Sequence, residues 1–240
     1  MLLLIKYTLL YGIVLMLVAL GGMFSEHSGV INIALEGIMV VGGLAGVLVT
    51  ASLPTTMAPA LIVLAAVVAA AVCGMLYSLL LAFASINLKA DQTIGGTALN
   101  MLAPALVPFL IRVIVNQNNM TLISGDSATW FMIKKTMLGF AKNDKLNFFQ
   151  ETFLNKVYLS TYICIIIFIM LSIVLYKTRF GLRLRACGEN PQAAASLGIN
   201  VVKMRYAGVT ISGALAGMGG FVYALTTANC ASNGDVAGFG

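Results

Sequence analysis

The chain has 240 residues, of which 60% are apolar and 9% are charged, whereas a soluble globular domain is roughly 45 to 50% apolar and about 25% charged. Together with a mean hydropathy of +0.98, this composition excludes an ordinary water-soluble fold and indicates a helical membrane protein. The net charge of +6 comes from Lys and Arg in short segments between apolar runs, which indicates topology signals and not a nucleic-acid surface.

Six apolar runs are long enough to be membrane-spanning helices, because a helix that rises 1.5 Å per residue needs about 20 residues to cross a hydrocarbon core of roughly 30 Å. We therefore predict an all-α fold, a polytopic transmembrane helical bundle with about six spans in one domain. The runs are residues 4–24, 31–51, 58–86, 93–115, 157–177 and 206–228. The third run is longer than the core is thick, so its helix is expected to tilt or to protrude.

Four polar side chains inside these runs are candidates for a polar pathway through the bundle. Glu36 in the second run would cost about 2.5 to 3.5 kcal/mol if unpaired at mid-bilayer, so it should face the bundle interior or water. Asn32 lies four residues earlier, on the same face of a helix, which permits a polar pair. For Glu36 a structural role is favoured over direct solute contact. Thr97 and Asn100 in the fourth run also share a face and could bind a solute, although hydrogen bonding between helices is the commoner use of such residues.

The polar stretch 116–156 is expected to be an external loop. Within it, residues 128–140 either lie in the membrane interface as an amphipathic segment or belong to an ordered loop with a few buried anchors, and the sequence supports both equally. Residues 178–205 are assigned to the cytoplasm because Arg179, Arg183 and Arg185 crowd the end of one span. The total count of Lys and Arg does not decide the orientation, since each side would hold seven.

The sequence LRLRACGENPQAAASLGIN, residues 182–200, predicts one short helix over residues 191–197. Asn190 suits the N-cap, Pro191 the first helical position and Gly198 the left-handed residue after the C-terminus. A helix of about 10 Å is too short to span a membrane and needs a surface to pack against. Its small side chains fit a groove on a cytoplasmic partner. A re-entry turn packed on its own protein is the equally supported alternative.

Two segments carry a specific family resemblance, and a third carries a weaker one. Residues 176–220, YKTRFGLRLRACGENPQAAASLGINVVKMRYAGVTISGALAGMGG, resemble the cytoplasmic loop and following helix of bacterial ATP-binding-cassette (ABC) importer permeases of the branched-chain amino acid, ribose and nucleoside superfamily. Residues 21–43, GGMFSEHSGVINIALEGIMVVGG, resemble the SERSGVxNIGxEG signature of the simple sugar and nucleoside branch. His27 stands where that branch usually has Arg, and Ala34 where it often has Gly. The weaker match is residues 90–103, ADQTIGGTALNMLA.

The resemblance implies a permease subunit that crosses the bacterial cytoplasmic (inner) membrane several times and translocates nucleosides or a related small polar solute. Besides the solute and membrane lipid, it implies three partners: a cytoplasmic ATP-binding subunit, a second permease subunit in a homodimer or heterodimer, and an external substrate-binding lipoprotein. The loop 178–205 would then hold a coupling helix seated in the ATPase subunit. The matching positions assigned to that contact are Arg183, Arg185, Gly188, Glu189, Asn190, Pro191, Ala193, Ala194 and Gly198.

The sequence contains no GxxxxGK[ST], HExxH or GxSxG motif and no paired His and Cys ligands. We therefore expect no catalytic residue, metal or cofactor in this chain, with ATP hydrolysis carried out by a separate subunit. Sugar, riboflavin or branched-chain amino acid remain alternative solutes for the same machinery. The alternative in a different functional class is an ATP-independent secondary transporter or channel. Relatives usually continue with further spans after a segment like residues 237–240, so the resemblance leaves open whether the chain continues beyond Gly240.

Overall fold

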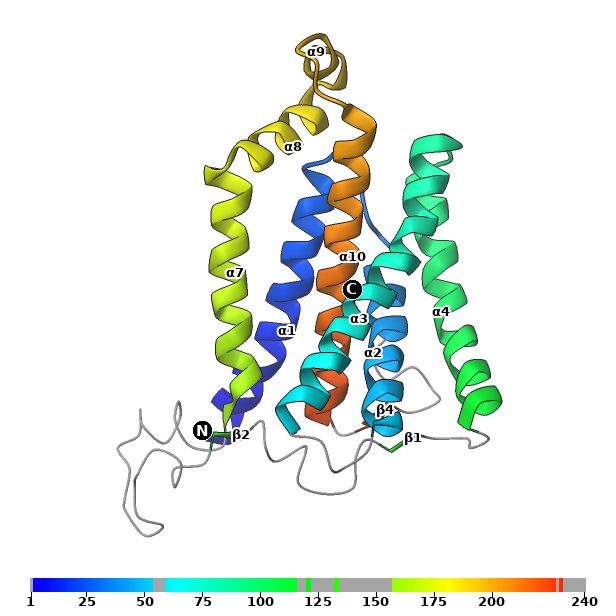
Figure 1. Cartoon of the computed structure of the whole chain (residues 1–240), viewed down its shortest axis with the longest axis vertical. Helices are drawn as coiled ribbons and strands as arrows, with labels where there is room; N and C mark the ends of the chain where they lie inside the picture. Colours follow the sequence, from blue (N-terminus) through cyan, green and yellow to red (C-terminus); the bar gives the residue numbers. More distant parts are fainter. Residues whose placement is uncertain are drawn as a thin grey trace.

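The computed structural model describes residues 2–53, 59–115, 120–121, 132–133, 157–227 and 229–230. They form a bundle of long helices that run roughly side by side (Figure 1). The long helices are α1 (Leu2–Glu26), α2 (Leu35–Ser52), α3 (Pro59–Ala82), α4 (Gln92–Val115), α7 (Leu159–Lys177) and α10 (Val201–Thr227). Two shorter helices, α8 (Arg179–Glu189) and α9 (Pro191–Ser196), cover one end of the bundle, and a π-helix, η1 (Phe83–Asn87), follows α3.

Four two-residue strands form two antiparallel pairs at the opposite end (Figure 1). β1 (Met120–Thr121) pairs with β4 (Asn229–Cys230), and β2 (Met132–Ile133) pairs with β3 (Val157–Tyr158). The remainder of the predicted loop 116–156, including the amphipathic candidate 128–140, and the C-terminal residues 231–240 lie outside the described residues.

The predicted all-α helical bundle is confirmed, and each predicted span corresponds to one long helix. Within the described residues, four helices are long and apolar enough to cross a membrane, and α7 with α8 makes a fifth candidate that is bent by 66°. The described side chains of α1 add a shorter apolar helix, Tyr11–Glu26. The long third run is divided into α3 and η1.

α10 lies in the centre of the bundle, where it packs against α1, α2 and α3. Glycines allow this close approach, because a Cβ added to Gly217 in α10 would overlap the backbone of Ala70 in α3. In the same way, a Cβ on Gly42 in α2 would overlap the backbone of Gly217. Lipid tails are as apolar as the side chains, so close contact between backbones at small residues is what holds such helices together.

α7 stands at the edge of the bundle, where it packs against α1 and α8 (Figure 1). Thr178 ends α7 because its backbone is extended and its Oγ1 accepts a hydrogen bond from the N–H of Gly181 at 3.3 Å, which starts α8. The chain therefore turns by 66° at this residue, and α8 runs across the end of the bundle to α9.

Candidate functional site

The predicted short helix is present as α9, which projects at the apex of the molecule (Figure 1). Asn190 caps its N-terminus by accepting a hydrogen bond from the N–H of Ala193 at 3.1 Å, and Pro191 fills the first helical position. At the other end Gly198 has a φ of +80°, which favours glycine, and its N–H donates to the carbonyl of Ala195 at 2.9 Å. The local sequence thus fixes both ends of this helix.

α9 turns one side toward its own protein and the other toward the surroundings. Ala194 is only 2% exposed, because α9 packs against α8 and the start of α10. Leu197 directly after the helix is 79% exposed, so about four fifths of its surface is available to a partner. The other exposed residues of this tip are Gln192, Ala193, Ala195, Ser196 and Gly198.

α8 connects this tip to the bundle through close contacts made by the C-terminal half of the helix. A Cβ on Gly188 would overlap the backbone of His27, directly after α1. The Arg185 guanidinium lies 5.3 Å from the ring centroid of Tyr176, and the His27 ring packs edge-on against the same tyrosine at 6.3 Å. A displacement of α8 would therefore press on the end of α1 and on the end of α7.

The inner side of α8 is apolar and its C-terminal end borders an open hollow. Leu184 and Cys187 are buried against the bundle. Burial raises the pKa of the Cys187 thiol, while the positive charge of Arg205 opposes that rise. The hollow has a volume of about 320 Å³ and is lined by Glu26, His27, Arg185, Gly188 and Glu189.

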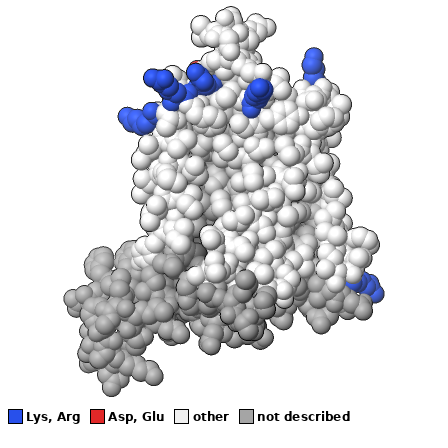
Figure 2. Space-filling model, viewed as in Figure 1, with Lys and Arg blue, Asp and Glu red and all other residues white. Residues whose placement is uncertain are grey.

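Basic side chains gather at the end of the molecule that carries α9 (Figure 2). Three contacts bring separate segments to this end: Gly188 touches His27, Tyr206 donates a hydrogen bond to Asn87 at 2.9 Å, and Ile31 donates one to Gln92 at 2.7 Å. The Lys and Arg residues on these segments are Lys89, Lys177, Arg179, Arg183, Arg185, Lys203 and Arg205. Arg179, Arg183 and Arg185 crowd the end of α7, which is the feature on which the expected cytoplasmic position of α8 and α9 rests.

Residues 27–34 between α1 and α2 are not helical, and polar side chains satisfy their backbone groups. Asn32 is 6% exposed and its Nδ2 donates to the Ser212 hydroxyl at 2.9 Å, while its Oδ1 accepts from the N–H of Ala34 at 3.1 Å. Asn100 donates to the carbonyl of Ile33 and accepts from the N–H of Gly37, both at 2.7 Å. Non-helical backbone is tolerated at membrane depth only where such groups are paired.

The structure corrects the expectation that Asn32 and Glu36 share a helical face. α2 begins at Leu35, because the chain first makes a turn with Gly29 at a φ of +85°, so Asn32 precedes the helix. Glu36 is partly buried in the first turn of α2, where the helix dipole favours a negative charge. Thr97 and Asn100 play different roles. Thr97 is exposed and its hydroxyl donates to the carbonyl of Thr93 in its own helix at 2.8 Å, whereas Asn100 bonds the segment before α2.

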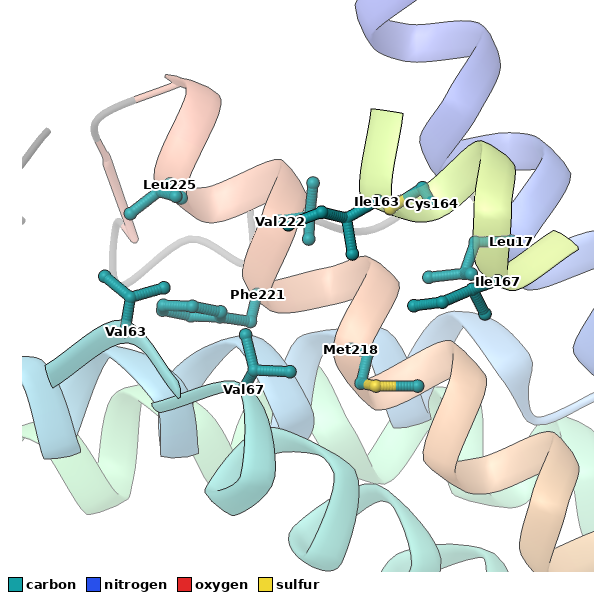
Figure 3. A pocket seen from close by; sticks show the side chains of 10 residues that line it. All are labelled: Leu17, Val63, Val67, Ile163, Cys164, Ile167, Met218, Phe221, Val222 and Leu225. Atoms are coloured by element: carbon teal, nitrogen blue, oxygen red, sulfur yellow. The ribbon is translucent and has the colours of Figure 1, made fainter. Parts of the chain in front are cut away.

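An apolar cavity of about 70 Å³ lies where α1, α3, α7 and α10 meet (Figure 3). Its lining contains no charged group or hydrogen-bonding amide, so it does not suit a polar solute. The labelled side chains in Figure 3 are Leu17, Val63, Val67, Ile163, Cys164, Ile167, Met218, Phe221, Val222 and Leu225.

Sequence reasoning missed two features of the site. α8 was not separated from the loop 178–205, although Thr178 is a good N-cap and Leu184 and Cys187 have the spacing of one helical face. Leu197 was not singled out, because a single leucine after small residues gives no sign of its exposure. Of the predicted contact residues, Arg183, Glu189 and Ala193 are exposed, whereas Ala194 faces inward.

The bundle of long apolar helices and the two short helices that cover its end define a multi-pass helical membrane protein. Residues 4–240 match the profile of the family described as branched-chain amino acid transport system / permease component. The chain belongs to this family of ABC transporter permeases. It is therefore a transport subunit and not an enzyme, and it is located in the cytoplasmic membrane.

Three curated relatives illustrate the similarity. The nucleoside ABC transporter permease protein NupC of Lactococcus lactis subsp. cremoris is 39% identical over 238 residues, which cover 97% of this chain and 70% of NupC. The guanosine ABC transporter permease protein NupQ of Bacillus subtilis is 40% identical over 236 residues, again 97% of this chain and 70% of the relative. A putative glucose ABC transporter permease protein, TsgC13 of Haloferax volcanii, is 32% identical over 86% of this chain and 58% of its own length. No solved structure matches the chain.

Proposed function

We propose that this permease subunit belongs to an ATP-driven importer that translocates nucleosides or a closely related solute. The observation that carries this proposal is the similarity over 97% of the chain to NupC and NupQ, which are named as nucleoside and guanosine permeases. Residues 21–43 are consistent with the same branch, since they resemble its SERSGVxNIGxEG signature.

Membership in the ABC permease family implies an ATP-binding subunit and a substrate-binding protein as partners. We extend this to a second permease subunit, as a homodimer or heterodimer, and to an external lipoprotein as the binding protein. Ile94 and Met101 of α4 are 70% and 81% exposed, which leaves this side of the helix open to such a second subunit. Thr97 lies on the same exposed part of α4 and is our candidate for a residue that meets the solute.

α9 is the proposed contact with the ATP-binding subunit, with Arg183, Arg185, Gly188 and Glu189 of α8 supporting it. The projecting tip, the exposed Leu197 and the basic surroundings support this assignment. The structure suggests a path for the motion that nucleotide binding would start. A shift of α9 moves α8, the contact between Gly188 and His27 transmits it to residues 27–34, and Asn32 and Asn100 connect that segment to α10 and α4.

Uptake by whole cells tests the proposed solute. Deletion of the gene should abolish high-affinity uptake of radiolabelled guanosine, and the wild-type gene supplied in trans should restore it. An excess of unlabelled adenosine should compete with guanosine, whereas glucose, leucine and riboflavin should not. Unchanged guanosine uptake in the deletion strain, or loss of glucose or leucine uptake instead, would contradict the proposal.

Transport by the purified chain separates the importer from a partner-independent transporter. The permease alone in lipid vesicles should not move guanosine, and addition of its ATP-binding subunit, its binding protein and ATP should start transport. Transport by the permease alone at the same rate would favour a secondary transporter or channel.

A further inference from the structure

The outer side of α7 presents a continuous apolar stripe to the membrane. Exposed side chains recur with the spacing of one helical face, and they are Ile166, Ile169, Met170, Ile173 and Tyr176. α7 stands at the edge of the bundle (Figure 1), so this stripe faces acyl chains. Its upper end carries a tyrosine, which is the residue type that favours the boundary between membrane and water.

Basic side chains begin where this apolar stripe ends. Lys177 is the last residue of α7 and Arg179 the first of α8, and both are exposed. Arg183 lies one turn further along α8 on the same side and is exposed too. The 66° bend at Thr178 turns α8 across the end of the bundle, so these charges follow directly on the end of the apolar stripe.

The acidic side chains of the described residues belong to other segments or to the far end of α8, and one of them is Glu36 in the first turn of α2. Glu26 and Glu189 line the hollow beside Arg185, and Asp91 accepts a hydrogen bond from the N–H of Thr93 at 2.7 Å at the start of α4. The bend between α7 and α8 is therefore a local site of positive charge. Basic residues directly cytoplasmic of a membrane helix attract anionic lipids, each adding roughly a fivefold increase in affinity near the surface.

We propose that an anionic phospholipid binds lengthwise along α7, with its acyl chains on the apolar stripe and its phosphate between Lys177 and Arg179. The joined apolar and basic surfaces match the two parts of such a lipid. A protein partner would be expected to engage the tip at α9, which extends beyond α8 (Figure 1), and not the lateral edge of α7. Because Lys177 and Arg179 are not among the proposed contacts with the ATP-binding subunit, failure of this inference leaves the proposed function intact.

Native mass spectrometry of the purified full-length permease tests the site, with phosphatidylglycerol and phosphatidylethanolamine as competing lipids. The wild-type protein should retain phosphatidylglycerol preferentially. The double variant Lys177→Gln/Arg179→Gln should lose that preference by roughly tenfold or more. The charge-conserving variant Lys177→Arg/Arg179→Lys should keep it, and so should the matched control Lys89→Gln/Lys203→Gln, which removes two exposed charges from the same end.

Three outcomes would overturn the inference. The first is no preference in the wild-type protein, and the second is an equal loss in the control Lys89→Gln/Lys203→Gln. The third is a variant Lys177→Gln/Arg179→Gln that retains phosphatidylglycerol as the wild-type protein does but binds the ATP-binding subunit more weakly in membranes of phosphatidylethanolamine alone. That result would assign this surface to the protein partner.

Discussion

Leu197 offers the sharpest test of how the tip at α9 works. Replacing this leucine with alanine removes three carbon atoms, which corresponds to about 2.4 kcal/mol at roughly 0.8 kcal/mol per buried methylene. The side chain is 79% exposed in the free chain, so about four fifths of this energy becomes available only when a partner covers it. We therefore expect Leu197→Ala to weaken binding of the ATP-binding subunit by about 2 kcal/mol, or roughly thirtyfold.

The affinity can be measured by titrating the purified ATP-binding subunit onto the permease in lipid nanodiscs. A matched control is Leu88→Ala, because Leu88 is 65% exposed at the same end of the bundle but away from α9. The control should leave the Kd unchanged, and both variants should keep the thermal stability of the wild-type permease. A Kd for Leu197→Ala within about threefold of wild type, or an equal loss in the control, would refute the reasoning.

Three further predictions concern the bundle and its end. Asn100→Leu leaves two backbone groups near the start of α2 unpaired and should destabilise the permease by about 1 to 3 kcal/mol, measured as a lower Tm. The control Thr97→Val removes only hydrogen bonds within its own helix and should change the Tm far less. Gly217→Val should lower the Tm and the yield of folded protein because its side chain would overlap α3, whereas Gly12→Val, with open space around it, should keep both near wild type. Burial raises the pKa of the Cys187 thiol. Alkylation of this thiol by iodoacetamide should therefore be slow at pH 7 in the folded permease, and it should accelerate at a higher pH than in the SDS-denatured chain. Equal rates of Cys187 alkylation in the two states would contradict its burial.

Hydropathy alone predicted the class of fold, because a helix that crosses a membrane needs a long apolar run whatever its neighbours are. It placed the start of the second helix too early, at residue 31. Val30 and Ile31 are apolar but not helical, because the turn at Gly29 and the hydrogen bonds of Asn32 keep this segment out of the helix. Such pairing depends on Ser212, far along the chain, so a local pattern could not reveal it.

The tip at α9 shows the same division between local and long-range information. The caps Asn190 and Gly198 are local signals, so the position of the helix was predicted to within a residue. Which side of the helix faces inward depends on how α8 and α10 approach it. The sequence therefore named Ala193 and Ala194 together as contact residues, whereas the structure exposes Ala193 and buries Ala194.

A photo-crosslinking amino acid placed at position 193 or 197 of the permease in the assembled transporter tests the central claim most directly. If α9 is the element through which the ATP-binding subunit moves the helices, both positions should crosslink to that subunit, and position 88 should not. Crosslinks from 193 and 197 only within the permease itself, or to the external binding protein, would contradict the claim.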